Sequence, residues 1–232
     1  MARPPPPNAA AGGGAPSLLS ALGDRAWQNS DKVSAEFVAI MYGTLVKSLL
    51  DDAALTAAEG PLSDAAIDAV NASLFDMGIS IGMRMIDEFL AKSGAPPCRT
   101  LAMTAEAVAK VAVRMFLGVA AGVERLVVGS QDGPRGGVAA AVLGTSVAPN
   151  TTAQWTSYSI VFDENPLNGF AELPEALRAR LWYSNLLAGI LSGALGQVGF
   201  KRVTVEFTRC KLRGDTTHEI TVRQLPSTAA TS

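Results

Sequence analysis

The stretch from Leu181 to Phe200 limits the fold more than any other, because it contains no Lys, Arg, Asp or Glu. A helix of this length without charge is long enough to span a membrane. Polar side chains and four glycines interrupt the stretch, however, and they make insertion into a bilayer less favourable. We therefore predict a helix that is buried on most of its circumference within a soluble domain, with a membrane span as the alternative.

Small residues recur at helical spacing in two separate segments. Gly189 and Gly193 lie one turn apart in the charge-free stretch, and Gly78 and Gly82 have the same spacing in a helix predicted over 64–92. Such faces allow a second backbone to approach closely, or they leave room between helices for a molecule that is not protein. The spacing alone does not decide between close helix packing and a gap.

Composition narrows the class of protein. The chain has 232 residues, enough for one domain with a full core, and 48% of them are hydrophobic while only 17% are charged. This balance predicts apolar surface that contacts partners. The formal net charge of −2 argues against a nucleic-acid-binding protein. Two cysteines give no disulfide framework and indicate a reducing compartment, and the N-terminus has no secretory signal pattern.

The periodicity of apolar residues predicts an α+β domain. Spacings of three and four indicate helices over about 33–50, 64–92 and 101–117, capped by Ser63 and Thr100 at two of their starts. Alternation then indicates a strand over about 155–162, a short partner at 170–173, and two further strands at 202–208 and 219–223. We predict four to five helices packed on a twisted four-stranded antiparallel sheet.

Composition also sets the expected boundaries. Residues 1–28 are rich in Pro, Ala and Gly and are predicted to form a disordered tail. A single domain follows over 29–225, with a flexible Gly- and Ala-rich insertion at about 123–153. Residues 226–232 form a second predicted tail.

Few residues offer chemistry. His218 is the only histidine, and the sequence contains no cluster with metal-ligand spacing, no nucleophile elbow and no P-loop, so we expect no enzyme and no metal. Cys98 is the exception, because the following helix and Arg99 would both favour its thiolate, the form that acyl transfer to sulfur requires. The alternative is a buried cysteine that acts as a small apolar residue.

Several ordered motifs resemble one known family. The segments 77–91 and 104–118, with Cys98 between them, and the later segments 164–167, 170–174, 183–187 and 193–195 are similar to trafficking protein particle (TRAPP) complex subunit 3. The resemblance covers about residues 30–225 apart from the 123–153 insertion. It implies the TRAPP small-subunit fold, a relative of the ligand-binding domain in NO signalling and Golgi transport.

The resemblance also implies a function. Subunits of this family form part of a vesicle-tethering complex that acts between the endoplasmic reticulum and the Golgi. They have no catalysis of their own, while the assembled complex exchanges nucleotide on a Rab-family GTPase. The implied partners are other small TRAPP subunits, in a helix-mediated heterodimer or, in isolation, a homodimer. The implied location is cytoplasmic, peripheral on cis-Golgi and endoplasmic reticulum membranes.

A further implication is a lipid. Family members carry a saturated acyl chain, a palmitate, thioester-linked to the cysteine that matches Cys98, inside an apolar channel. Burying a sixteen-carbon tail would contribute about 10 kcal/mol at most, which favours a structural role for the lipid. Pro97 stands before Cys98 where the family usually has a basic residue. The residues predicted to line the channel are Gly78, Gly82, Ala105, Val108, Ala112, Met115, Gly189 and Gly193.

One alternative remains within the same superfamily. The chain would then be a binding module for a small apolar ligand, outside the tethering complex. A thioester at Cys98 favours the tethering subunit, whereas an exchangeable, non-covalent ligand favours the binding module.

Overall fold

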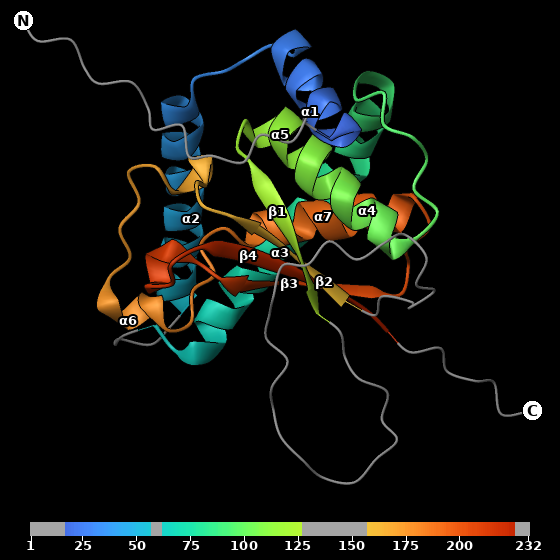
Figure 1. Cartoon of the computed structure of the whole chain (residues 1–232). Coiled ribbons are helices and arrows are strands. Elements are labelled where there is room, and N and C mark those ends of the chain that lie inside the picture. The colour runs from blue at the N-terminus through green and yellow to red at the C-terminus, as the bar shows by residue number, and fades with distance from the viewer. Residues whose placement is uncertain (1–16, 57–61, 127–156, 226–232) are drawn as a thin grey trace, which may run out of the picture.

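The computed structural model describes residues 17–56, 62–126 and 157–225 (Figure 1). The first half of the chain is helical and the second half carries most of the sheet. In chain order the elements are α1 (Leu18–Asn29), α2 (Ala35–Thr56), α3 (Asp64–Lys92), α4 (Leu101–Ala107), the π-helical η1 (Val108–Ala112), α5 (Val113–Leu117), β1 (Ala121–Leu126), β2 (Ser157–Phe162), the 3-10 turn η2 (Pro166–Asn168), α6 (Glu175–Arg178), α7 (Asn185–Gln197), β3 (Val203–Arg209), the 3-10 turn η3 (Lys211–Arg213) and β4 (His218–Gln224).

The strands form one antiparallel sheet in the order β1-β2-β4-β3. Alternation gives the sheet an apolar face, on which Tyr158 and Ile160 of β2 lie opposite Val222 and Ile220 of β4. All four are at most 5% exposed, so this face is part of the core. In Figure 1, α7 and α3 lie behind the sheet. The predicted α+β class with a four-stranded antiparallel sheet is confirmed.

The contact between α3 and α7 explains the glycine faces. A Cβ atom on Gly78 would lie 2.2 Å from the carbonyl oxygen of Leu186, and one on Gly82 would lie 2.0 Å from that of Ile190. On α7, a Cβ on Gly189 or Gly193 would lie 2.1 or 2.3 Å from a carbonyl oxygen of α3. The two backbones are therefore in direct contact, and only glycine fits at these four positions. The prediction that these glycines line a channel is wrong.

Residues 101–117 form one continuous helical rod, as the sequence predicts. The Thr100 side chain accepts a hydrogen bond from the Met103 N–H at 3.2 Å, and Gly118 ends the rod with a left-handed φ of 72°. The middle of the rod, η1, is a π-helical turn, a local widening that often occurs at functional sites. The helix predicted over 181–200 is shorter than expected, because α7 begins only at Asn185.

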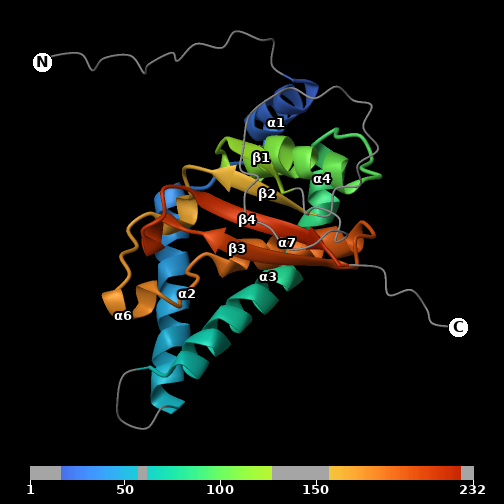
Figure 2. The same cartoon turned by 60° about the horizontal axis from the view of Figure 1, so that its bottom comes forward.

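The prediction of a tail over residues 1–28 is wrong from residue 18 onward, because these residues form α1. Gly23 of α1 packs against the Lys110 backbone of η1, and Asp24 forms an ion pair of 2.7 Å with Arg114 of α5. Figure 2 shows α1 on the outer side of α4 and β1, away from α2 and α3. The remaining tail residues, 1–16 and 226–232, lie outside the described residues.

Two predictions about the strands are also wrong. The insertion was expected to begin at residue 123, but Ala121–Leu126 form β1, which pairs with β2. Residues 127–153 of that insertion lie outside the described residues. Residues 170–173 do not form a strand, because Phe170 has a left-handed φ of 65° in the turn after η2, a conformation that interrupts a strand.

Candidate functional site

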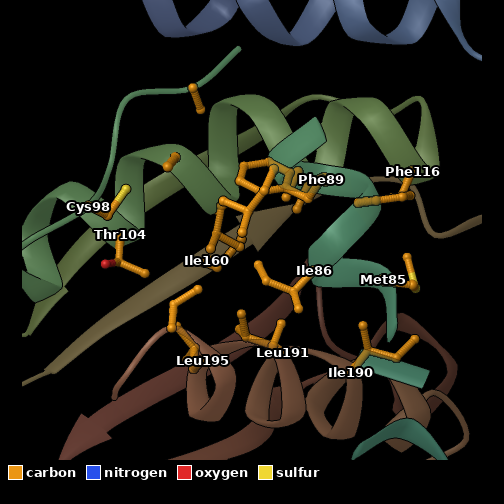
Figure 3. A pocket seen from close by; sticks show the side chains of 18 of the residues that line it. Met85, Ile86, Phe89, Cys98, Thr104, Phe116, Ile160, Ile190, Leu191 and Leu195 are labelled. Atoms are coloured by element: carbon orange, nitrogen blue, oxygen red, sulfur yellow. The ribbon is translucent and has the colours of Figure 1, made fainter. Parts of the chain in front are cut away.

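A cavity of about 350 Å³ lies between the α4–η1–α5 rod, α7, the end of α3 and strands β2 and β4 (Figure 3). Its wall is apolar apart from Thr104 and the thiol of Cys98. The volume is within the range of pockets that hold small ligands. The lining residues are Met85, Ile86, Phe89, Leu90, Ala95, Pro96, Pro97, Cys98, Thr104, Ala107, Val108, Ala112, Val113, Phe116, Leu117, Ile160, Phe162, Leu187, Ile190, Leu191, Ala194, Leu195, Val198 and Ile220.

The cavity is elongated, and its chemistry differs between the two ends. Figure 3 shows Cys98 and Thr104 together at one end, with Met85 and Phe116 at the other. Leu90 lines the cavity and is nevertheless 59% exposed, so the cavity reaches the protein surface. The arrangement is an apolar cavity that is open to the surface and has a single thiol at one end.

The predicted channel residues are divided between the cavity and the core. Val108 and Ala112 lie on the cavity wall, and so does Cys98. Ala105 and Met115 do not line it, because their side chains, 0% and 3% exposed, pack in the core. The prediction for these two residues is therefore wrong, as it is for the four glycines.

Sequence reasoning missed most of the wall. Met85 and Phe89 belong to an apolar stripe on α3 and line the cavity, whereas the only α3 residues predicted to line it are Gly78 and Gly82. The signal was incomplete, because an apolar stripe at helical spacing is the same for a filled core and for an empty channel. The channel exists because the stripe of α3 continues past the α3–α7 glycine contact.

The Cys98 thiol is partly buried between backbone carbonyls. Its Sγ lies 3.7 Å from the carbonyl oxygen of Pro96 and 3.6 Å from that of Met103. Burial raises the pKa of the Cys98 thiol, and a hydrogen bond with Thr104 lowers it to a lesser extent. The sequence-based prediction that the helix and Arg99 favour the thiolate is wrong, since desolvation is the dominant effect.

The other titratable groups of interest are structural. His218 is 2% exposed and stacks on Phe162 with ring centroids 5.3 Å apart. Burial is the main reason that the pKa of His218 falls to about 4, and nearby Lys211 lowers it further. Within residues 17–56, 62–126 and 157–225, no group of three or more His, Cys, Asp or Glu side chains could hold a metal ion. No helix in the same ranges is long and apolar enough to cross a membrane.

Comparison with known proteins gives a consistent result. The sequence model of the transport protein particle (TRAPP) component family matches residues 38–223. The chain is 36% identical over 201 residues to trafficking protein particle complex subunit 3 of Dictyostelium discoideum, covering 87% of this chain and 88% of that protein. It is 32% identical over 210 residues to subunit BET3 of Saccharomyces cerevisiae, covering 88% of each.

A solved structure is similar as well. It is the crystal structure of a trafficking protein particle complex subunit 3 from Naegleria fowleri covalently bound to palmitic acid, with 40% identity and a TM-score of 0.63. The match covers 84% of this chain and 98% of that one. The chain described above therefore belongs to the TRAPP component family, and within that family to the subunit 3 (Bet3) group.

Proposed function

We propose that this chain is a scaffold subunit of a TRAPP vesicle-tethering complex and carries a buried S-acyl chain on Cys98. The observation that carries the proposal is the apolar cavity of about 350 Å³ with the Cys98 thiol at one end. The covalent palmitate of the Naegleria fowleri relative supports the same chemistry. The chain itself performs no catalysis in this proposal.

The acylation step needs an acyl thioester as donor. The Cys98 thiol loses its proton to solvent, and the thiolate attacks the carbonyl carbon of the donor. A new carbon–sulfur bond forms, the bond to the donor's own sulfur breaks, and the donor leaves as a free thiol. No oxidant or reductant is required. Because burial raises the pKa of Cys98, only a small fraction of the side chain is in the reactive thiolate form at neutral pH.

The energetics favour a lipid that stays inside the protein. Each buried methylene contributes about 0.8 kcal/mol, so a tail of roughly fifteen carbons contributes on the order of 10 kcal/mol at most. A bilayer would offer the same tail a similar gain, and a single chain is a marginal membrane anchor. The acyl chain therefore acts as part of the core, filling a space that side chains leave open.

The expected partners are other small TRAPP subunits. Phe37, Ile40 and Met41 of α2 are 61%, 60% and 58% exposed and follow one another at helical spacing. An exposed apolar stripe of this kind is typical of a surface that another protein covers. In this proposal the stripe pairs with a second TRAPP subunit, or with another copy of the chain in isolation. The assembly acts at cis-Golgi and endoplasmic reticulum membranes and exchanges nucleotide on a Rab-family GTPase.

Intact-mass spectrometry tests the lipid directly. The protein purified from its own cells should exceed the sequence mass by one palmitoyl group, and hydroxylamine should remove the excess. The Cys98→Ser variant is the control and should show the sequence mass throughout. A mass excess that survives hydroxylamine contradicts the thioester. An apolar ligand that dissociates on unfolding, with no covalent adduct, supports the alternative binding module.

Co-purification tests the assembly. The tagged chain should recover other TRAPP subunits, identified by mass spectrometry. Ile40→Asp should reduce this recovery, because it places a charge in the exposed stripe without disturbing the core. Recovery that contains no TRAPP subunit contradicts the scaffold role.

A further inference from the structure

A second pocket lies beside Cys98. It has a volume of about 300 Å³ and is bounded by Leu19 of α1 and by Met103 and Glu106 of α4. Pro96 and Cys98 line this pocket as well as the cavity described above, so the two spaces meet at the thiol. Met103 is 43% exposed, so the second pocket is open to the surface. Its volume is at the lower end of the range of pockets that hold small ligands, and it is therefore large enough for a ligand of its own.

The Cys98 thiol lies at the boundary of both spaces. Its Sγ is 3.6 Å from the carbonyl oxygen of Met103 and 3.7 Å from that of Pro96, and both of these residues line the second pocket. In Figure 3 the same side chain stands at one end of the cavity, together with Thr104. Different faces of α4 border the two spaces, since Thr104 lines only the cavity and Ala102 lines only the second pocket.

Acylation of Cys98 requires two spaces at the thiol. The carbonyl carbon of a thioester donor carries the acyl chain on one side and the leaving sulfur on the other. If the acyl chain lies in the cavity, the part of the donor attached to the leaving sulfur must extend in another direction. In coenzyme A thioesters that part begins with the pantetheine arm, an uncharged chain with two amide groups that joins the sulfur to the nucleotide.

We propose that the second pocket binds the pantetheine arm of the thioester donor that acylates Cys98. This inference rests on the proposed function and assigns it a binding site for the leaving group. Leu19 and Met103 provide apolar contacts for the carbons of the arm, and the Glu106 carboxylate accepts a hydrogen bond from an amide N–H. Glu106 is the only charged residue among those that line the pocket, and its negative charge repels phosphate, so the nucleotide end of coenzyme A lies outside.

The two spaces have separate roles in the reaction. The Cys98 thiolate attacks the carbonyl carbon of the donor, a new carbon–sulfur bond forms, and the bond to the pantetheine sulfur breaks. The leaving thiolate takes a proton from solvent and departs through the open side of the second pocket, while the acyl chain stays in the cavity. The second pocket therefore determines how fast the thioester forms, and the cavity determines how stable the acylated protein is.

The first test compares two donors with the same reacting atoms. Protein treated with hydroxylamine is acylated by octanoyl-pantetheine or by octanoyl-N-acetylcysteamine, whose thiol part is a truncated pantetheine, and intact mass gives the initial rates. The octanoyl chain is short enough to keep both donors monomeric. The wild-type kcat/KM should be higher for octanoyl-pantetheine by about tenfold or more, the value of one or two hydrogen bonds with the contacts around them. Equal values for the two donors overturn the inference.

The second test fills the pocket. Ala102→Phe adds a ring to the pocket wall and should bring the ratio of the two kcat/KM values close to one, whereas Ala69→Phe, on an exposed face of α3, is the matched control and should leave the ratio unchanged. Ala112→Leu, on the cavity wall, should slow both donors alike. Glu106→Gln, which preserves the shape of the side chain, should lower the ratio by about three- to tenfold, because a charged acceptor becomes a neutral one.

The outcomes separate this inference from the proposed function. An unchanged ratio in folded Ala102→Phe overturns the inference, and an equal loss of rate with both donors overturns it too, because the pocket would then be the entrance for the acyl chain. Either result leaves the thioester at Cys98 intact. If Ala102→Phe does not fold, the wild-type ratio and Glu106→Gln decide. Failure of the wild-type protein to form any thioester at Cys98 overturns both.

Discussion

Substitution of Ala112 is the most direct test of whether the acyl chain occupies the cavity, because Ala112 belongs to η1, lines the cavity and is only partly buried. Leucine at this position adds three carbons to a cavity of about 350 Å³. If those carbons displace three methylenes of the acyl chain, the acylated form loses about 2 kcal/mol, or roughly thirtyfold in the equilibrium with a thioester donor. The free protein should respond in the opposite direction, because leucine fills part of an empty space.

The free Ala112→Leu protein should gain about 1 kcal/mol of stability, which raises its Tm by about 2–4 °C in a domain of this size. Added to the loss in the acylated form, this gain brings the shift of the acylation equilibrium to roughly a hundredfold. The assay combines intact mass, for the acylated fraction at a fixed ratio of palmitoyl-coenzyme A to coenzyme A, with thermal unfolding of both forms. Ala69→Leu, on an exposed face of α3, is the matched control and should change neither quantity. Unchanged acylation in a folded Ala112→Leu protein refutes the idea that the tail occupies this cavity.

Three further predictions address packing and ionisation. Gly82→Ala should destabilise the protein by about 1–3 kcal/mol in denaturant unfolding, because its Cβ would lie 2.0 Å from a carbonyl oxygen. The control is Gly196→Ala, which should be neutral or stabilising because no atom lies within 4 Å of the added Cβ. Equal effects of the two substitutions would contradict the backbone contact. Because the folded-state pKa of His218 is about 4, below its ordinary value of 6.5, only the unfolded state gains a proton between these values. The free energy of unfolding should therefore fall by about 2 kcal/mol between pH 6.5 and pH 5, and it should fall less in His218→Asn. The same dependence of unfolding free energy on pH in both proteins would contradict the effect of burial on His218. The rate at which iodoacetamide alkylates Cys98 should still rise with pH at pH 9.0, because the pKa of the thiol is raised. Intact mass measures the rate, with Cys98→Ser as the control, and a rate that reaches a plateau below pH 8 would contradict the raised pKa.

The sequence predicts the elements whose signals are local. Ser63 and Thr100 accept the capping hydrogen bonds expected of them, and Gly118 ends the rod in a left-handed conformation. The alternation in β3 and β4 is equally clear. These features depend on a few neighbouring side chains and on backbone geometry, which the order of residues determines directly.

The failures occur where one pattern has two physical outcomes. The amphipathic α1 lies beside Pro- and Gly-rich residues, so composition over a wide window concealed it, and β1 was missed because it leads directly into a Gly- and Ala-rich sequence. The glycines on α3 and α7 were ambiguous, because a missing side chain permits either contact or a void. Only the distance between the two helices distinguishes these outcomes, and that distance depends on residues far apart in the sequence.

The contact between the α3 and α7 backbones also determines on which side of the cavity the backbone can move. Helices that touch at Gly78, Gly82, Gly189 and Gly193 have no side chains between them that could change rotamer. The backbone on the α3–α7 side of the cavity is therefore fixed, and a backbone shift that makes room for a bulkier ligand would have to come from the opposite side, where the π-helical turn interrupts regular α-helical bonding.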